Sequence, residues 1–129
     1  MVPNVAHFIW ITGPKSRDFS YINLLAIMAA NAYGKFDKIL MHTNEPPVGN
    51  PHWDRASEMF EIVKASPPKW ISGIPLEHVQ YQADVMRLDI MIEQGGFYLD
   101  TDTIVLRDMS RFRSDPLTLC RESPDSIAM

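Results

Sequence analysis

The chain has 129 residues, which is enough for one domain and too few for two. Hydrophobic residues make up 46% of it and charged residues 22%, the composition of a globular domain with a core of its own. The formal net charge is −4, without the excess of basic residues that nucleic-acid binders carry, so we expect no nucleic-acid partner. A single cysteine, Cys120, excludes an internal disulfide and a thiolate zinc site.

No apolar run reaches the roughly 20 residues of a membrane-spanning helix, so no membrane span is expected. Residues 1–15 are apolar but lack both a basic start and a small-residue cleavage site, and we therefore predict no signal peptide. These features predict a cytoplasmic location for the chain as given. A Golgi-type or secreted location is the alternative if the chain is a fragment of a longer protein.

Strands and helices alternate along the first three quarters of the chain. Runs of β-branched and aromatic residues predict strands, and apolar residues three and four apart predict helices. The expected elements are a strand at 5–11, a helix at 18–33, a strand at 38–42, a loop at 43–51, a helix at 51–63, a short strand at 69–71 and a helix at 76–94. The first helix is expected to begin at Asp18 or Ser20 and to end at Gly34. Its helical spacing is that of the apolar residues Ile22, Leu25, Met28, Ala29 and Ala32.

The last of these helices has one apolar stripe, formed by Val79, Ala83, Met86 and Ile90. Two glycines end it, a short strand is expected at 97–99, and residues 103–106 are apolar and β-prone. Residues 107–129 are polar and interrupted by proline. This order of elements predicts an α/β domain whose sheet is largely parallel and flanked by helices.

Two carboxylates, Asp100 and Asp102, follow the last short strand in the sequence GGFYLDTDTIV at 95–105. Open α/β sheets bind ligands beyond the carboxyl ends of their strands, so carboxylates at this place are candidates for a ligand site. Mg²⁺ and Mn²⁺ prefer oxygen ligands and often combine one or two carboxylates with substrate phosphates. The aspartates are therefore candidate metal ligands, although the spacing by itself favours an ordinary exposed acidic turn.

Asp84 and Arg87 are three residues apart on a predicted helix, so their side chains are neighbours on one face. They form either a surface ion pair worth about 0.3–0.5 kcal/mol or a site in which Arg87 binds sugar or phosphate oxygens and Asp84 accepts from a sugar hydroxyl. Trp10 is either a core aromatic or a platform for a base or sugar ring. The four histidines have neither the spacing nor the cysteine partners of a zinc site.

Three segments in this order resemble one family. They are HFIWITG at 7–13, the helical Gln82-x-Asp84-x-x-Arg87-Leu88, and GGFYLDTD at 95–102. Together they resemble the DXD-containing sugar transferases of glycosyltransferase family 32, and the same order of motifs occurs in the catalytic domains of the large clostridial glucosylating toxins. The resemblance spans about residues 3–106, and it favours the ligand interpretation of the two aspartates over the exposed turn.

The resemblance implies a GT-A fold, a Mn²⁺ or Mg²⁺ cofactor and a nucleotide-sugar donor, with a UDP-sugar expected before GDP-mannose. It implies transfer of a hexose, with retention of configuration, to an unknown glycan, lipid or protein acceptor. The catalytic residues it implies are Asp84 and Arg87 at the donor sugar, Asp100 near ribose, sugar and metal, and Asp102 as direct metal ligand. The nucleotide contacts it implies are Ile9 and Trp10 at uracil and ribose, Asn44, and Tyr98. No protein nucleophile is implied.

Members of this family ordinarily continue well past the DXD strand, whereas 23 residues follow Leu106 here. We therefore expect residues 1–129 to form one incomplete, C-terminally short GT-A domain, its nucleotide-sugar-binding half. A module that binds nucleotide sugar without turnover and a purely structural fragment stay open as alternatives. A phosphatase of the haloacid dehalogenase type, with Asp100 as nucleophile and Asp102 as general acid, is a remote alternative because no lysine follows Lys69.

Overall fold

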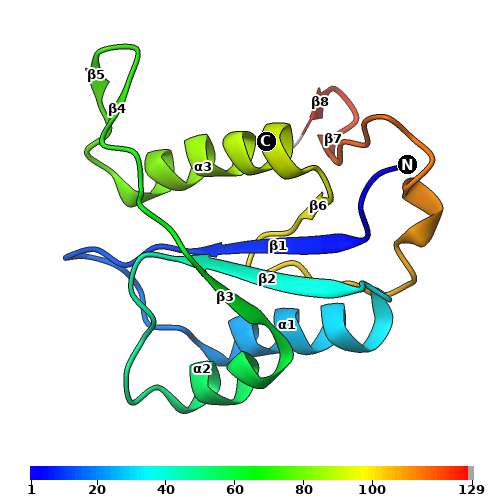
Figure 1. Ribbon diagram of the computed structural model, residues 1–129, viewed down its shortest axis with the longest axis horizontal. Coiled ribbons are helices and arrows are strands. Elements are labelled where there is room, and N and C mark those ends of the chain that lie inside the picture. Colours follow the sequence, from blue (N-terminus) through cyan, green and yellow to red (C-terminus); the bar gives the residue numbers. More distant parts are fainter. Residues whose placement is uncertain (128–129) are drawn as a thin grey trace.

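A four-stranded sheet in the order β3–β2–β1–β6 organises the fold, and the computed structural model describes residues 1–127 of the chain (Figure 1). Every neighbouring pair in this sheet is parallel. The strands are β1 (Val5–Trp10), β2 (Lys38–Thr43), β3 (Glu61–Lys64) and β6 (Phe97–Tyr98). Because all pairs are parallel, the carboxyl ends of the strands lie at one edge of the sheet, where ligands bind in open α/β folds.

Helices cover both faces of the sheet (Figure 1). Helices α1 (Tyr21–Tyr33) and α2 (Pro51–Ala56) pack on one face, and α3 (Val79–Gln94) packs on the other. Successive residues of a strand point to opposite faces, so Phe8 of β1 enters the larger core beside α1 and Ile9 enters a smaller cluster beside α3. The α/β class and the parallel sheet flanked by helices are thus confirmed, and the arrangement is compatible with a GT-A-like fold.

The expected helix at 51–63 is wrong in its second half. Helix α2 ends at Ala56, a 3₁₀ turn (η1, Ser57–Met59) follows, and the chain then forms β3. Strand β3 pairs with β2 in parallel, with Ile62 opposite Met41. This pairing satisfies the backbone of β3 and overrides a local sequence pattern that suits a continued helix.

The apolar residues whose spacing indicated the first helix are buried only in part. Its N-cap is Ser20, one of the two expected starts. Ile22 is 46% exposed, and Leu25 is only partly buried. Leu24 and Ile27 face the core instead. Helix α1 is apolar on most sides, so the spacing of its residues does not by itself select the buried face.

The other expectations divide in a similar way. The stripe of α3 is confirmed, because Met86 and Ile90 are buried against the sheet. Residues 103–106 form no strand. Short elements appear elsewhere: β4 (Trp70–Ile71) pairs with an unexpected β5 (Ile74–Pro75), and the C-terminal part contains η2 (Ser110–Phe112), β7 (Arg121–Ser123) and β8 (Ser126–Ile127). The last two residues of the expected C-terminal segment lie outside the described residues. None of the described helices combines the length and hydropathy that crossing a membrane requires.

Two buried histidines connect β1, β2 and the end of α3. The Nδ1 atom of His7 and the Nε2 atom of His42 are 2.9 Å apart, and the two residues are 1% and 3% exposed. The ring of His7 also forms a hydrogen bond with the backbone of Gly95. Burial lowers the pKa of His7, and burial together with the neighbouring His7 lowers the pKa of His42 to about 4. Both rings are therefore neutral at pH 7.

We expect the free energy of unfolding to fall as the pH drops from about 6.5 toward 4. Since both histidines have a lower pKa in the folded state than in the unfolded state, their contribution is complete above the unfolded value and is lost as the pH approaches the folded one. For His42 the loss at pH 5 is about 2 kcal/mol. Urea denaturation at neutral pH and at pH 5 measures this difference. In a His42→Gln variant the drop should shrink, and an unchanged drop would contradict the assignment.

Candidate active site

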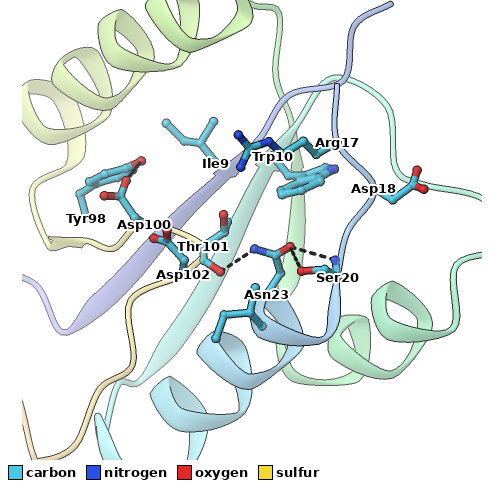
Figure 2. A pocket seen from close by; sticks show the side chains of 11 residues that line it. Ile9, Trp10, Arg17, Asp18, Ser20, Asn23, Tyr98, Asp100, Thr101 and Asp102 are labelled. Atoms are coloured by element: carbon cyan, nitrogen blue, oxygen red, sulfur yellow. Dashed lines mark hydrogen bonds between the residues drawn. The ribbon is translucent and has the colours of Figure 1, made fainter. Parts of the chain in front are cut away.

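A cavity of about 430 Å³ opens at the carboxyl ends of β1 and β6, beside the amino end of helix α1 (Figure 2). This volume is typical of small-molecule sites. Five of the residues expected at a nucleotide-sugar site line it, namely Ile9, Trp10, Tyr98, Asp100 and Asp102. Residues far apart in sequence thus meet at the edge of the sheet where the parallel topology predicts a ligand.

Trp10 is both a core aromatic and a wall of the cavity. Its ring and that of Phe19 pack in a T-shaped arrangement, with ring centroids 5.0 Å apart and an angle of 76° between the ring planes. Its Nε1 atom is buried and finds no hydrogen-bond partner among the described residues. Because an unpaired buried donor costs stability, native structures rarely keep one without a functional or structural reason.

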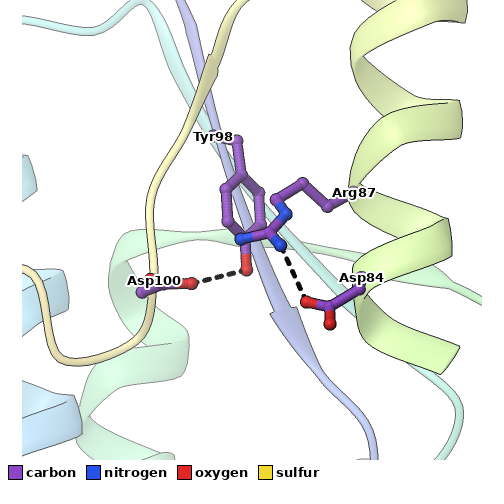
Figure 3. Close-up of polar contacts among 4 residues, drawn as sticks. All are labelled: Asp84, Arg87, Tyr98 and Asp100. Carbon is purple, nitrogen blue, oxygen red and sulfur yellow. Dashed lines mark hydrogen bonds and ion pairs between the residues drawn. The ribbon is translucent and has the colours of Figure 1, made fainter. Parts of the chain in front are cut away.

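A chain of four side chains connects helix α3 to the turn that carries the aspartates (Figure 3). On α3, an oxygen of Asp84 lies 2.7 Å from the Nη2 atom of Arg87. The guanidinium of Arg87 lies over the ring of Tyr98, 5.1 Å from its centroid. The hydroxyl of Tyr98 then donates to Oδ1 of Asp100 at 2.8 Å. Asp84 and Arg87 do not line the cavity, but two contacts join them to Asp100.

The electrostatics of Tyr98 favour its role as a donor. Burial raises the pKa of the Tyr98 hydroxyl well above its usual value, and the negative charge of Asp100 raises it further. The hydroxyl therefore keeps its proton at physiological pH and holds one oxygen of the Asp100 carboxylate in place. The other carboxylate oxygen of Asp100 takes no part in this hydrogen bond.

The turn that carries Asp100 and Asp102 offers carboxylate oxygens, which are suitable ligands for a hard cation. Asp100 and Asp102 are both exposed, and the Thr103 backbone N–H closes the turn on the carbonyl of Asp100 at 3.0 Å. Within residues 1–127 no group of three or more His, Cys, Asp or Glu side chains is arranged to hold a metal ion. Two carboxylates fit a divalent cation of the kind that keeps several waters and takes further oxygens from a bound phosphate.

Asn44 is not brought together with the other expected site residues. It follows β2, and it is not among the described residues that line the cavity. Its Oδ1 accepts from the backbone N–H of Thr12 at 2.9 Å and from the Thr12 hydroxyl at 3.2 Å. Its Nδ2 donates to the carbonyl of Thr12 at 2.9 Å. The side chain thus joins the loop after β1 to the end of β2.

Six further residues line the cavity that the sequence analysis did not select: Arg17, Asp18, Ser20, Ile22, Asn23 and Thr101. Most belong to the loop before α1 and to its first turn. A capping signal points to two of them, because Ser20 and Asn23 have the Ser-x-x-polar spacing of a helix start. The charges of Arg17 and Asp18 carry no such pattern.

Removal of the Asn44 side chain should destabilise the fold. We expect Asn44→Ala to lower the free energy of unfolding by about 1–3 kcal/mol, because it leaves partly buried polar groups of Thr12 without partners. Denaturant unfolding measures the change. The matched control is Asn31→Ala on the exposed side of α1, where little loss is expected. Equal stability of both variants would contradict this bridging role and would favour the predicted nucleotide contact instead.

Comparison with known proteins places these features in a family context. The family described as "Glycosyltransferase sugar-binding region containing DXD motif" matches residues 14–122. Glucan organizing enzyme 1 of the fungus Cryptococcus neoformans var. grubii is 33% identical over 132 residues, which cover 98% of this chain and 36% of that protein. The chain thus spans about a third of the length of this curated relative. No solved structure matches the chain.

Proposed function

Because the chain belongs to the glycosyltransferases whose sugar-binding region contains a DXD motif, we propose that it binds a nucleotide sugar and transfers its hexose to an acceptor. The proposed donor is a UDP-sugar, and the proposed cofactor is Mn²⁺ or Mg²⁺ at Asp100 and Asp102. The observation that carries the proposal is the shared cavity, in which Trp10 and Tyr98 lie with both aspartates. The phosphatase alternative is set aside, since it requires a different family.

The nucleotide is proposed to bind at the end of β1. Trp10 offers the flat face of an indole whose orientation is fixed by its T-shaped contact with Phe19. Aromatic faces stack favourably on planar rings, so uracil is a suitable ligand for this wall. Ile9 would contact the base or the ribose, and Tyr98 would border the nucleotide from β6. Asn44 would reach the nucleotide only if its hydrogen bonds to Thr12 were exchanged.

The diphosphate is proposed to lie near the DXD turn. A bound divalent cation supplies positive charge there, which stabilises the negative charge that develops when the bond between sugar and phosphate breaks. Asp102 would bind this cation directly. Asp100, oriented by the Tyr98 hydroxyl, would present its second oxygen toward metal, ribose or sugar.

The donor sugar is proposed to lie between the DXD turn and helix α3. Arg87, stacked on Tyr98, would bind sugar hydroxyls, and Asp84 would accept from another hydroxyl. In the transfer the bond between the anomeric carbon and the phosphate oxygen breaks, and the acceptor oxygen forms the new bond to that carbon. The acceptor's proton leaves with the diphosphate or passes to solvent. No protein nucleophile is proposed, and retention in a single displacement then requires attack from the side on which the diphosphate departs.

We propose that residues 1–129 are the donor half of a GT-A domain. The expected donor contacts all lie between Ile9 and Asp102, whereas the fungal relative extends far beyond the matched region. A second candidate is a module that binds nucleotide sugar without turnover, which the same cavity residues would serve. The name of the relative refers to glucan, a polymer of hexose, and this supports a hexose as the transferred sugar.

The function is tested with UDP, Mn²⁺ and the Asp102→Ala variant. We expect Asp102→Ala to weaken Mn²⁺-dependent UDP binding at least tenfold in calorimetry, while the stability of the fold changes by less than about 0.5 kcal/mol because the carboxylate is exposed. Asp89→Ala, which removes an exposed carboxylate on α3, is the matched control and should bind as the wild type does.

Equal UDP affinity in the two variants would contradict a metal site at Asp102 and would leave the DXD turn as an ordinary exposed acidic turn. Turnover is measured separately, as release of hexose from UDP- and GDP-hexoses with Mn²⁺ and no acceptor. A transferase hydrolyses its donor slowly under these conditions, whereas a binding module leaves it intact.

The sugar contacts are tested by Asp84→Asn and Arg87→Lys. Both should leave UDP affinity within about twofold of wild type and abolish the affinity difference between UDP and the UDP-hexose that binds best. Lysine cannot reproduce the planar guanidinium that stacks on Tyr98 and binds two oxygens at once. Arg55→Lys on α2 is the matched control. If the affinity difference between UDP and the UDP-hexose is unchanged in both variants, Asp84 and Arg87 form only a surface ion pair.

A further inference from the structure

The side chain of Asn23 joins helix α1 to the turn that carries the two aspartates (Figure 2). Its Nδ2 donates to the carbonyl oxygen of Thr101 at 2.8 Å, across 78 positions of sequence. Its Oδ1 accepts from the backbone N–H of Ser20 at 2.9 Å and from the Ser20 hydroxyl at 3.0 Å. Asn23 is 8% exposed, so these bonds are largely shielded from water.

The helix start alone does not require asparagine at this place. An acceptor oxygen at the third helical position is enough to bond the N–H of Ser20, and glutamate or glutamine commonly supplies it in capping boxes. The Thr101 carbonyl, in contrast, needs a donor. A carboxamide offers an acceptor and a donor on one short side chain, whereas a carboxylate offers acceptors only. The nitrogen of Asn23 is therefore accounted for by the DXD turn.

Thr101 lies between Asp100 and Asp102, and its carbonyl belongs to the planar peptide unit that links Thr101 to Asp102. On the Asp100 side, the turn is also held by the Tyr98 hydroxyl. On the Asp102 side, the side-chain hydrogen bond from Asn23 is the one that reaches the turn from another element within residues 1–127. Loss of the Asn23 nitrogen would thus free the half of the turn that carries Asp102.

We infer that Asn23 is a positioning residue, which fixes the DXD turn relative to the amino end of α1 and thereby sets the direction of Asp102. Its consequence for cation and nucleotide binding rests on the proposed function. Asn23 also lines the cavity, but the role assigned to it here is that of positioning the turn. It acts through the backbone of Thr101.

Two variants separate the helix cap from the DXD turn. Asn23→Asp keeps the acceptor for Ser20 and removes the donor to Thr101. Ser20→Ala is the matched control, because it removes one bond of the cap and keeps the contact with Thr101. Backbone NMR order parameters of residues 101–103 should stay near 0.85 in the wild type and in Ser20→Ala, and should fall below about 0.7 in Asn23→Asp. The amides of α1 in the same spectra report whether the helix stays intact.

The binding consequence is measured with UDP and Mn²⁺. We expect Asn23→Asp to weaken Mn²⁺-dependent UDP binding about tenfold. Asn31→Asp, which makes the same change at an exposed position of α1 outside the cavity, should alter it less than twofold. An added negative charge near the turn attracts the cation but repels the diphosphate. Asn23→Ala, which removes the donor and adds no charge, should therefore weaken binding as well. Asn23→Glu, which retains a capping carboxylate and lacks the donor, should behave in the same way and serves if Asn23→Asp does not fold.

The order parameters decide the positioning role whatever the ligand. A turn as rigid in Asn23→Asp and Asn23→Glu as in Ser20→Ala overturns the inference. A turn that loosens only when the donor is lost supports it, even if the wild type binds no UDP with Mn²⁺. That last result would instead contradict the proposed function, so the two failures are distinguishable.

Discussion

The geometry of the cavity depends on a close backbone approach at the link between α3 and β6. Gly95 and Gly96 have φ angles of 65° and 93°, which favour glycine. A Cβ atom on Gly96 would lie 2.6 Å from the carbonyl oxygen of Val5, too close for any side chain. Because β6 pairs with β1 through two residues only, this approach determines where Tyr98 and the aspartates after it lie.

The buried histidines extend this constraint into the sheet. His42 on β2 contacts His7 on β1, and His7 forms a hydrogen bond with the backbone of Gly95. Since both rings are neutral at pH 7 and buried, they satisfy one another and a backbone group without placing charge under the site. The backbone N–H of Leu99 also donates a hydrogen bond to the carbonyl of His7 on β1. The end of β6, just before the DXD turn, is therefore bonded to β1, and β1 is bonded in turn to β2.

The DXD turn is held from two sides of the sheet. Helix α3 reaches it through Arg87, Tyr98 and Asp100, and helix α1 reaches it through Asn23 and Thr101. The two helices lie on opposite faces of the sheet (Figure 1). The turn with the aspartates is thus contacted from both helical layers. Exposed carboxylates are thus presented from a backbone that has little freedom to move, which is the arrangement that a binding site needs.

The amino-acid sequence by itself determined the α/β class, the stripe of α3 and the DXD turn, because periodic apolar residues, paired glycines and adjacent carboxylates are local signals. It did not determine β3, whose strand state depends on pairing with β2, nor the buried face of the nearly all-apolar helix α1. It also gave no sign that Asn44 bonds Thr12 or that Asn23 bonds Thr101. Those contacts join residues 32 and 78 positions apart, and they exist only once the parallel sheet has brought the strand ends to one edge.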